Sequence, residues 1–443
     1  MTPPTTPRPN LRPPLRARGR RARGTAGGAG GIGGAARRVA WAAALLLALA
    51  APAAAASKAA VEAQFRAWLE ATIWPAAQAK GVSRATFDAA LGKAALDWSL
   101  PDLVPPGTTP REVQWQAEFA SPARYFAEDK LGPLVTGGRQ LAATWAKTLA
   151  AVEARYGVPK EIVVAIWGRE SAFGRAKLPK AAVPTLATMA FMGTRKAMFV
   201  PELVAALEIL EGDHIPLSEM KSSLAGALGQ PQFLPSKYLA YAVDFDGDGR
   251  RDIWKSVPDT LASIANYLRA HGWVAGAPWG VEALLPEGVT CALEGPEQGQ
   301  PLSALAKAGV TRIDGGTLPG KAGDERFLML PAGRLGPAFV VSRNFYVLKT
   351  YNESDLYALF IGHLADRLGG GKAGFSGRWA TVSGFNRGDV RAMQQRMVKA
   401  GYDVGEVDGF VGFKTRTAIG TWQARKGLAA TCYPDKALIG AIR

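Results

Sequence analysis

Histidine and cysteine are scarce in this sequence. Among 443 residues there are three histidines and two cysteines. His214, His271 and His363 show none of the short spacings typical of metal ligands, which argues against a zinc centre. Cys291 and Cys432 fall in different predicted domains. An oxidising compartment would permit a disulfide between them, but we expect both to be buried free thiols.

Long hydrophobic runs are missing after residue 57, so no transmembrane helix is predicted there. The sequence before residue 57 has three parts. A leader rich in Pro, Gly and Arg covers residues 1–38, an apolar run covers residues 39–51, and small residues follow up to Ala56. Such a succession is typical of an export signal. We therefore predict that residues 1–56 are an export signal with a disordered basic leader, cleaved near Ala56. A retained membrane anchor is the alternative.

Acidic residues are outnumbered by basic ones, 37 against 53, which gives a formal net charge of +16. Nine of the positive charges lie between Arg8 and Arg38, where there is no acidic residue. A basic surface suits an anionic partner such as nucleic acid, membrane headgroups or an acidic polymer. Because no recognised nucleic-acid-binding motif is present, we expect no nucleic-acid partner.

Helical periodicity dominates the predicted main domain, residues 57–368. Apolar residues recur at three-and-four spacing over residues 140–156 and 160–170, among other segments. Residues 280–340 differ, because Gly and Pro are frequent there and the short apolar runs predict strands. The fold class is therefore predicted to be mainly α (α+β), with a small β-containing insert in the main domain.

Glu170 is the candidate for catalysis. It lies one turn beyond Ile166 and Trp167, on the apolar face of a predicted helix that Pro159 can open. A carboxyl group in this position should be partly desolvated, which raises its pKa, and a glycosidase needs such a protonated acid. From spacing alone, an ordinary glutamate that faces solvent or pairs with a neighbouring arginine is the alternative.

Five ordered segments carry a family resemblance. Residues 164–174, which contain Glu170, resemble the catalytic motif of the lytic murein transglycosylase B family. Four further segments agree in the order of that family: 223–236, 241–249, 263–273 and 344–352. Together they cover roughly residues 60–368, and five ordered motifs are more specific than any one alone.

The resemblance implies a lysozyme-like helical fold in a periplasmic enzyme, with Glu170 as its one catalytic carboxyl group and no catalytic cofactor. By that analogy Glu170 protonates the glycosidic oxygen between N-acetylmuramic acid and N-acetylglucosamine in peptidoglycan. It then acts as a base on the muramoyl C6 hydroxyl, which closes a 1,6-anhydro ring. A muramidase that uses water and a non-catalytic wall-binding scaffold are the alternatives.

The resemblance also implies residues that bind the glycan. The polar and aromatic groove positions are Ser223, Gln232, Tyr267, Tyr346, Tyr351 and Asn352, and a basic pair for stem-peptide carboxylates is Arg195 and Lys196. Aromatic faces and hydroxyl groups suit sugar rings. For each tyrosine alone, core packing with a tethered hydroxyl is an equal alternative, and the basic pair could simply face solvent.

An acidic loop predicts a structural calcium ion. Residues 244–249 fit the opening of an EF-hand loop, in which oxygen ligands at alternate positions converge on a hard cation. The predicted ligands are Asp244, Asp246, Asp248 and the backbone carbonyl of Arg250, and the family resemblance adds Asp259. The usual last position holds Lys255, which cannot bind a cation. The alternative is a turn rich in Asp and Gly that binds no ion.

A small C-terminal segment follows a linker. Three glycines open the predicted linker, residues 369–384, and residues 385–443 form the predicted second domain. Its segments 389–395, 401–403 and 408–419 resemble the three-helix peptidoglycan-binding module. We therefore expect peptidoglycan glycan strands as the partner, with the module raising substrate concentration near Glu170. A structural appendage that no longer binds is the alternative.

Overall fold

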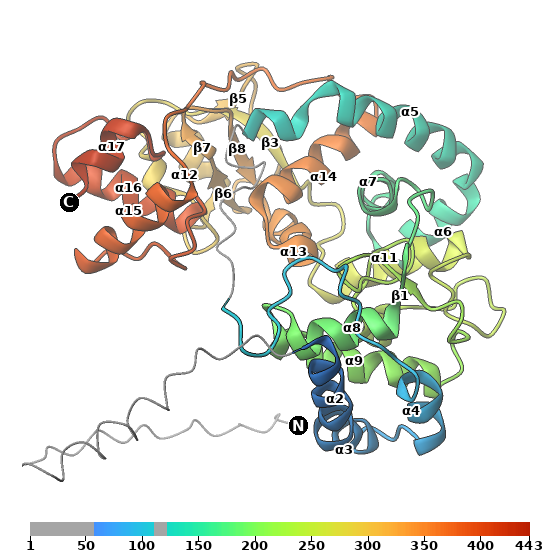
Figure 1. Cartoon of the computed structure of the whole chain (residues 1–443). Helices are drawn as coiled ribbons and strands as arrows, with labels where there is room; N and C mark the ends of the chain where they lie inside the picture. Colours follow the sequence, from blue (N-terminus) through green and yellow to red (C-terminus); the bar gives the residue numbers. More distant parts are fainter. Residues whose placement is uncertain (1–56, 110–121) are drawn as a thin grey trace, which may run out of the picture. The chain divides into compact units, whose positions relative to one another are not determined.

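The computed structural model describes residues 57–109 and 122–443 (Figure 1). The predicted export signal, residues 1–56, lies outside the described residues. Contacts join the described residues into one compact unit. Within the part of the chain that the structure describes, no helix is both long and apolar enough to cross a membrane.

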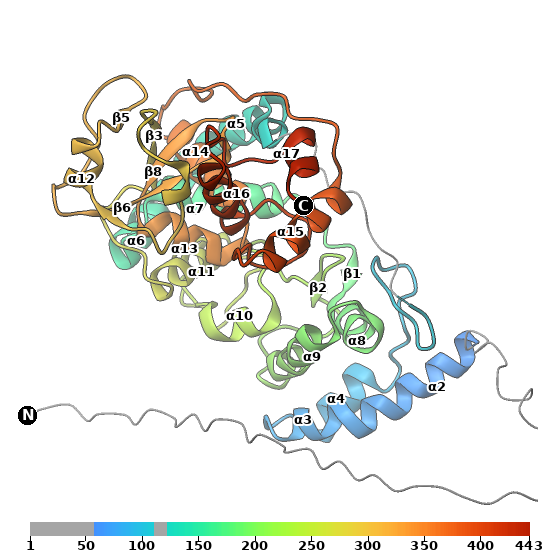
Figure 2. The same ribbon diagram turned by 90° about the vertical axis from the view of Figure 1, so that its left-hand side faces the viewer.

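Short helices open the main domain and pack on a helical pair. The first elements are α2 (Lys58–Trp68), the π-helical turn η1 (Leu69–Ile73), α3 (Trp74–Gln78) and α4 (Arg84–Leu91). The pair consists of α8 (Ala182–Met192) and α9 (Lys196–Glu211). Figure 2 shows α2 and α3 in one line, with α4 beside them. The buried residues of α2, Val61 and Phe65, lie one turn apart, so one face of this helix enters the core.

Helix α7 (Lys160–Ser171) lies at the centre of the main domain. Its residues from Ile162 to Gly168 are all buried, which is the expected position for a helix that is apolar on every side. The helices packed around it are α5 (Glu128–Thr144), α6 (Ala146–Tyr156), α11 (Val257–Ala270) and α14 (Asp355–Leu368). The predicted helix over residues 160–170 is thus present, and it is held from several sides.

The remaining elements of the main domain are short. They are η3 (Pro122–Phe126), β1 (Lys180–Ala181), β2 (Lys221–Ser222), α10 (Pro235–Tyr241), η4 (Cys291–Leu293), α12 (Leu302–Lys307) and α13 (Arg343–Asn352). Strands β1 and β2 pair antiparallel. Helix α13 packs against α14, so the two helices and the turn between them form a hairpin.

A five-stranded sheet forms the insert. Its strands are β3 (Gly280–Leu284), β4 (Gln300–Pro301), β5 (Thr311–Arg312), β6 (Glu325–Met329) and β8 (Ala338–Val341), and β7 (Pro331–Arg334) lies between the last two in sequence. The order is β4-β6-β8-β3-β5, with antiparallel pairing throughout. Alternate residues of β6 and β8 enter two cores: Phe327 joins the helical core and Leu328 joins a smaller core of the insert. The prediction of a mainly α fold with a small β insert is confirmed.

Three helices make the C-terminal module, α15 (Arg387–Lys399), α16 (Phe413–Arg425) and α17 (Lys436–Ala441). A separate core, which includes Val390, Met393 and Ile419, joins them. A capping box between Asn386 and Asp389 starts α15, which satisfies backbone N–H groups at the helix start. The prediction of a three-helix module is confirmed.

The two cysteines form a disulfide, so the expectation of free thiols is wrong. Cys291 in η4 bonds to Cys432 in the module, with their Cα atoms 6.1 Å apart. Both residues are fully buried, as expected, but helix α16 packs on η4 and brings together sites 141 positions apart. The error arose because nothing in the sequence indicated that the insert and the module touch.

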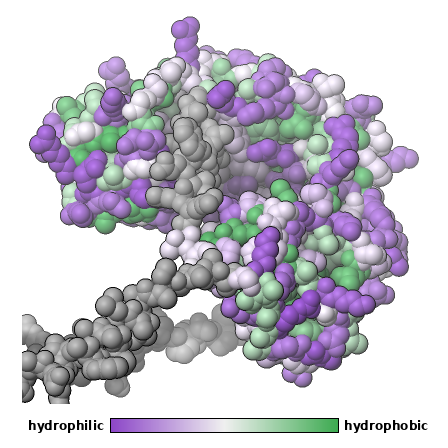
Figure 3. All heavy atoms as spheres, viewed as in Figure 1, coloured by the Kyte–Doolittle hydropathy of each residue, from purple (hydrophilic) through white to green (hydrophobic). Residues whose placement is uncertain are grey.

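On the face shown in Figure 3, hydrophilic residues predominate and apolar ones are scattered.

Candidate active site

Glu170 lies at the end of α7, just before a tight turn. Ala172, Phe173 and Gly174 have φ values of 49°, 63° and 78°, a left-handed conformation that side chains with a β-carbon rarely adopt. At Gly174 an added Cβ would lie 2.4 Å from the Oε1 atom of Gln230, so a larger residue would have to displace an amide that accepts a hydrogen bond from Trp167. Such strained residues cost of order 1–3 kcal/mol each and persist only where their surroundings fix them.

Trp167 fixes this turn from inside. Its indole Nε1 donates a hydrogen bond of 2.7 Å to Oε1 of Gln230, and its ring meets the edge of Phe173 at a centroid distance of 5.3 Å. Ser171 adds a hydroxyl that accepts the N–H of Gly174 at 2.9 Å. The residues that follow Glu170 are therefore rigidly placed, and with them its carboxyl group.

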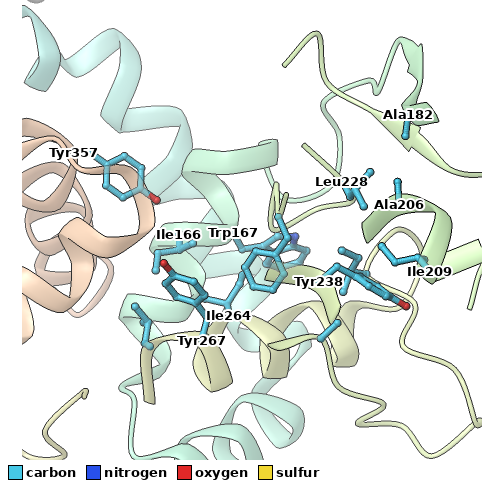
Figure 4. Close-up of a cluster of buried hydrophobic side chains, with 14 of the residues drawn as sticks. Ile166, Trp167, Ala182, Ala206, Ile209, Leu228, Tyr238, Ile264, Tyr267 and Tyr357 are labelled. Carbon is cyan, nitrogen blue, oxygen red and sulfur yellow. The ribbon is translucent and has the colours of Figure 1, made fainter. Parts of the chain in front are cut away.

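Tyr357 holds the Glu170 carboxyl directly. Its hydroxyl group donates to Oε1 of Glu170 at 2.5 Å. Tyr357 lies in the first turn of α14, is almost fully buried and points toward α7 (Figure 4). Sequence reasoning missed this residue, because its only sequence signal, an aromatic side chain on an apolar helix face, is shared with many core residues.

The surroundings raise the pKa of Glu170. Burial is the largest cause, because it disfavours the charged form, while the Tyr357 hydrogen bond and the charges of Arg169 and Lys237 oppose it. Burial and the nearby Glu170 charge raise the pKa of Tyr357 well above its usual value, so this phenol remains a donor. The site therefore holds a carboxyl group that can keep a proton, beside a fixed donor that stabilises it after the proton leaves.

Two predicted glycan-binding tyrosines line the same region. The hydroxyl of Tyr267 donates to the carbonyl of Thr350 at 2.6 Å, and that of Tyr351 donates to the carbonyl of Pro231 at 2.7 Å. Their rings meet at 4.9 Å, and the ring of Tyr351 stacks on that of Tyr357 at 6.3 Å. Tyr267 is fully buried, which favours packing with a tethered hydroxyl, whereas Tyr351 is half-buried.

The other predicted groove residues lie on nearby loops and on α13. Ser223 and Gln232 are half-buried in the loop that carries Pro231, and the Gln232 amide donates to the carbonyl of Gly229 at 2.8 Å. Tyr346 is half-buried against the ring of Phe327 at 5.1 Å.

Asn352 and Arg169 line one cavity of about 1140 Å³. Residues of the C-terminal module, such as Phe413 and Arg416, also line this cavity, and Glu170 is not among its lining residues. The predicted basic pair, Arg195 and Lys196, lies elsewhere, exposed at the start of α9, and no described contact joins it to Glu170.

Three of the predicted calcium ligands converge. Asp244, Asp246 and Asp259 each offer a carboxylate oxygen within 4.8 Å of the others. Asp259 is fully buried, and its two oxygens accept backbone N–H groups of Phe245 and Asp252, both at 2.8 Å. Burial chiefly raises the pKa of Asp259 to about 6, and the charge of Asp246 adds to this. A buried carboxyl beside other carboxyls suits a hard cation that would neutralise it.

Asp248 and Arg250 are placed differently from that group. A carboxylate oxygen of Asp248 accepts the backbone N–H of Arg250 at 2.8 Å, and Asp248 is not among the three convergent carboxylates. The distant Asp259, suggested by the family resemblance and not by loop spacing, is the one that meets Asp244 and Asp246.

Comparison with known proteins gives two family matches and several similar proteins. Residues 64–366 match the family described as the transglycosylase SLT domain, and residues 386–442 match the putative peptidoglycan binding domain. The membrane-bound lytic murein transglycosylase B of Escherichia coli is 36% identical over 226 residues. That match covers 48% of this chain, and it spans only 58% of the relative's length.

Solved structures extend the likeness over more of the chain. SltB3 from Pseudomonas aeruginosa, in complex with NAG-anhNAM-pentapeptide, is 39% identical with a TM-score of 0.74, covering 86% of this chain and 99% of that one. The Escherichia coli lytic transglycosylase SLT35, in complex with calcium, is 27% identical with a TM-score of 0.53, covering 70% and 92%. Because the first family match spans more than half of the residues, the chain belongs to the transglycosylase SLT domain family.

Proposed function

We propose that this protein is a lytic transglycosylase that cuts the β-1,4 bond between N-acetylmuramic acid and N-acetylglucosamine in peptidoglycan. The observation that carries the proposal is the Glu170 carboxyl, which has a raised pKa and a hydrogen bond of 2.5 Å from Tyr357. The relative named as a lytic murein transglycosylase, and the structure of SltB3 in complex with NAG-anhNAM-pentapeptide, support the reaction type.

In the proposed reaction Glu170 acts twice. As an acid it gives its proton to the glycosidic oxygen, and the bond from that oxygen to the muramoyl anomeric carbon breaks. As a carboxylate it then removes the proton of the muramoyl C6 hydroxyl, whose oxygen bonds to the anomeric carbon. The products are a 1,6-anhydromuramoyl end and a free 4-hydroxyl on the N-acetylglucosamine, and Glu170 regains its proton.

The charges around Glu170 support one carboxyl in both roles. Arg169 and Lys237, both cations, act to lower its pKa. They favour the carboxylate that forms when the proton is given away.

We propose that the glycan binds beside Glu170. Tyr351 and Tyr346 are half-buried and could present ring surface to sugars, with Ser223, Gln232 and Asn352 as polar partners. Tyr267 supports Tyr351 from the core. We propose the exposed pair Arg195 and Lys196 only for more distant stem-peptide carboxylates.

The proposal also covers calcium, architecture and location. A structural calcium ion bound by Asp244, Asp246 and Asp259 fits the convergent carboxylates, and the relative solved with calcium supports it. The domains proposed are an export signal (1–56), a catalytic domain (57–368), a linker (369–384) and a peptidoglycan-binding module (385–443). Export to the periplasm, with or without peripheral membrane association, follows from the basic leader and apolar run.

Mass spectrometry of digested peptidoglycan tests the function. Wild-type protein should release fragments with 1,6-anhydro ends, and Glu170→Gln should release none while its circular dichroism spectrum is unchanged. Reducing ends in place of anhydro ends would show a hydrolase, and no fragments from the wild type would show a binding protein. Full activity of Glu170→Gln would refute the role of Glu170.

A further inference from the structure

The C-terminal module meets the main domain through a buried charge network. Arg416, on α16, is 2% exposed, and its guanidinium donates to both oxygens of Glu294 at 2.9 and 2.6 Å. It also donates to Oδ2 of Asp355 at 2.7 Å. Lys349 binds the other oxygen of Asp355 at 2.6 Å. Two cations and two carboxylates thus form a formally neutral network, in which each charge has a partner.

Asp355 connects this network to the active site. It is the first residue of α14, and Tyr357 lies two positions further in the same turn. Ser354 caps this turn, with its hydroxyl accepting the N–H of Tyr357 at 3.3 Å. Burial acts to raise the pKa of Asp355, but Arg416 and Lys349 outweigh it and hold the pKa below its usual value, so the carboxylate stays charged.

We infer that Arg416 is a positioning residue for Glu170: by holding Asp355 it fixes the first turn of α14, and with it the Tyr357 hydroxyl that hydrogen-bonds to Glu170. The module is then a structural part of the active site as well as a binding domain. This inference rests on the proposed function, because it concerns how the proposed acid is placed. Buried ion pairs tie parts together specifically even where their net contribution to stability is small.

A double variant breaks the link while leaving no unpaired charge. Arg416→Met with Glu294→Gln removes one cation and one anion, and the new amide oxygen can still accept the N–H of Leu330 that Glu294 now accepts at 2.9 Å. Asp355 keeps Lys349 as its partner. Arg416→Lys is the conservative variant, which keeps the charge but loses the planar fork. Arg425→Gln, an exposed arginine on the same helix, is the matched control.

Steady-state kinetics on soluble peptidoglycan strands give the readout, with anhydro ends counted across pH. We expect the double variant to lower kcat roughly tenfold, because that is the effect of losing one ordinary hydrogen bond in the transition state. We expect little change in KM. The basic limb of its pH profile should move to higher pH, as in Tyr357→Phe, because a weaker Tyr357 contact favours the protonated acid. The kcat and basic limb of Arg416→Lys should lie between those of the wild type and the double variant. Those of Arg425→Gln should match the wild type.

A double-mutant cycle makes the inference falsifiable. If Arg416 acts through Tyr357, then the double variant combined with Tyr357→Phe should lose little more kcat than Tyr357→Phe alone. Additive losses, or a raised KM with an unchanged kcat and basic limb, would overturn the inference and leave the module as a binding domain only. Absence of anhydro products from the wild type would instead overturn the proposed function, so the two failures are distinguishable.

Discussion

Replacing Tyr357 by phenylalanine tests the contact that places the proposed acid. The variant removes one hydroxyl and keeps the buried ring, so the hydrogen bond of 2.5 Å to Glu170 is lost with little change in packing. This bond is stronger when Glu170 is ionised, which is its state once the proton has moved to the glycosidic oxygen. The hydroxyl therefore stabilises the transition state more than the ground state.

The size of the effect follows from the kind of bond. A hydrogen bond to a charged group contributes about 1.5–3 kcal/mol, which corresponds to a fall in kcat of roughly 10- to 100-fold. Because the bond lowers the pKa of Glu170 against the larger effect of burial, its loss raises that pKa further. The basic limb of the kcat/KM profile should therefore move to higher pH, as measured by release of anhydro ends.

Tyr351→Phe is the matched control for this experiment. It removes a hydroxyl from a neighbouring ring, but that hydroxyl donates to the backbone carbonyl of Pro231 and not to Glu170. It should leave the basic limb in place, even if substrate binding weakens. A Tyr357→Phe enzyme with wild-type kcat and an unmoved basic limb would refute the assigned role of Tyr357, and equal changes in both variants would refute its specificity.

Three further predictions concern stability. Glu170→Gln should raise the melting temperature at pH 7. The reason is that the pKa of Glu170 is higher in the folded than in the unfolded chain, so its carboxyl group destabilises the fold as pH rises above about 4.5. Calorimetry at pH 4 should show no gain in melting temperature. Chelation should lower the melting temperature of the wild type but not that of Asp259→Asn. The melting temperature of Asp248→Asn, a residue outside the three convergent carboxylates, should still fall on chelation. Equal falls in all three proteins would contradict the calcium site. Replacing Cys291 and Cys432 together by serine should lower the free energy of unfolding by about 2–5 kcal/mol in urea titrations, and a reductant should then have no further effect.

The sequence predicts what is local and leaves out what tertiary packing brings together. The helix predicted over residues 160–170 depends on short-range periodicity, and it is found at Lys160–Ser171. The contact of Tyr357 with Glu170 joins residues 187 positions apart, and the disulfide joins residues 141 positions apart. No local pattern encodes which buried helix faces which.

The proposed calcium site likewise combines ligands that local sequence predicts with one that only tertiary packing brings close. Loop spacing selected Asp244, Asp246 and Asp248, since they occupy alternate positions of one turn. The structure brings the first two to Asp259 and uses Asp248 to accept a backbone N–H, because the start of α11 delivers a buried carboxyl from another element. Sequence spacing can identify candidate ligands along one loop. It cannot identify a ligand that a neighbouring helix supplies.

The features around Glu170 also explain why strain and buried charge are tolerated here. A half-buried carboxyl group, left-handed residues at Ala172 and Phe173 and a buried arginine each cost stability when taken alone. Each has a specific partner in this fold: Tyr357 binds Glu170, Trp167 packs on Phe173, and carboxylates surround Arg416. The first two partnerships lie within the main domain, and the third joins the main domain to the C-terminal module.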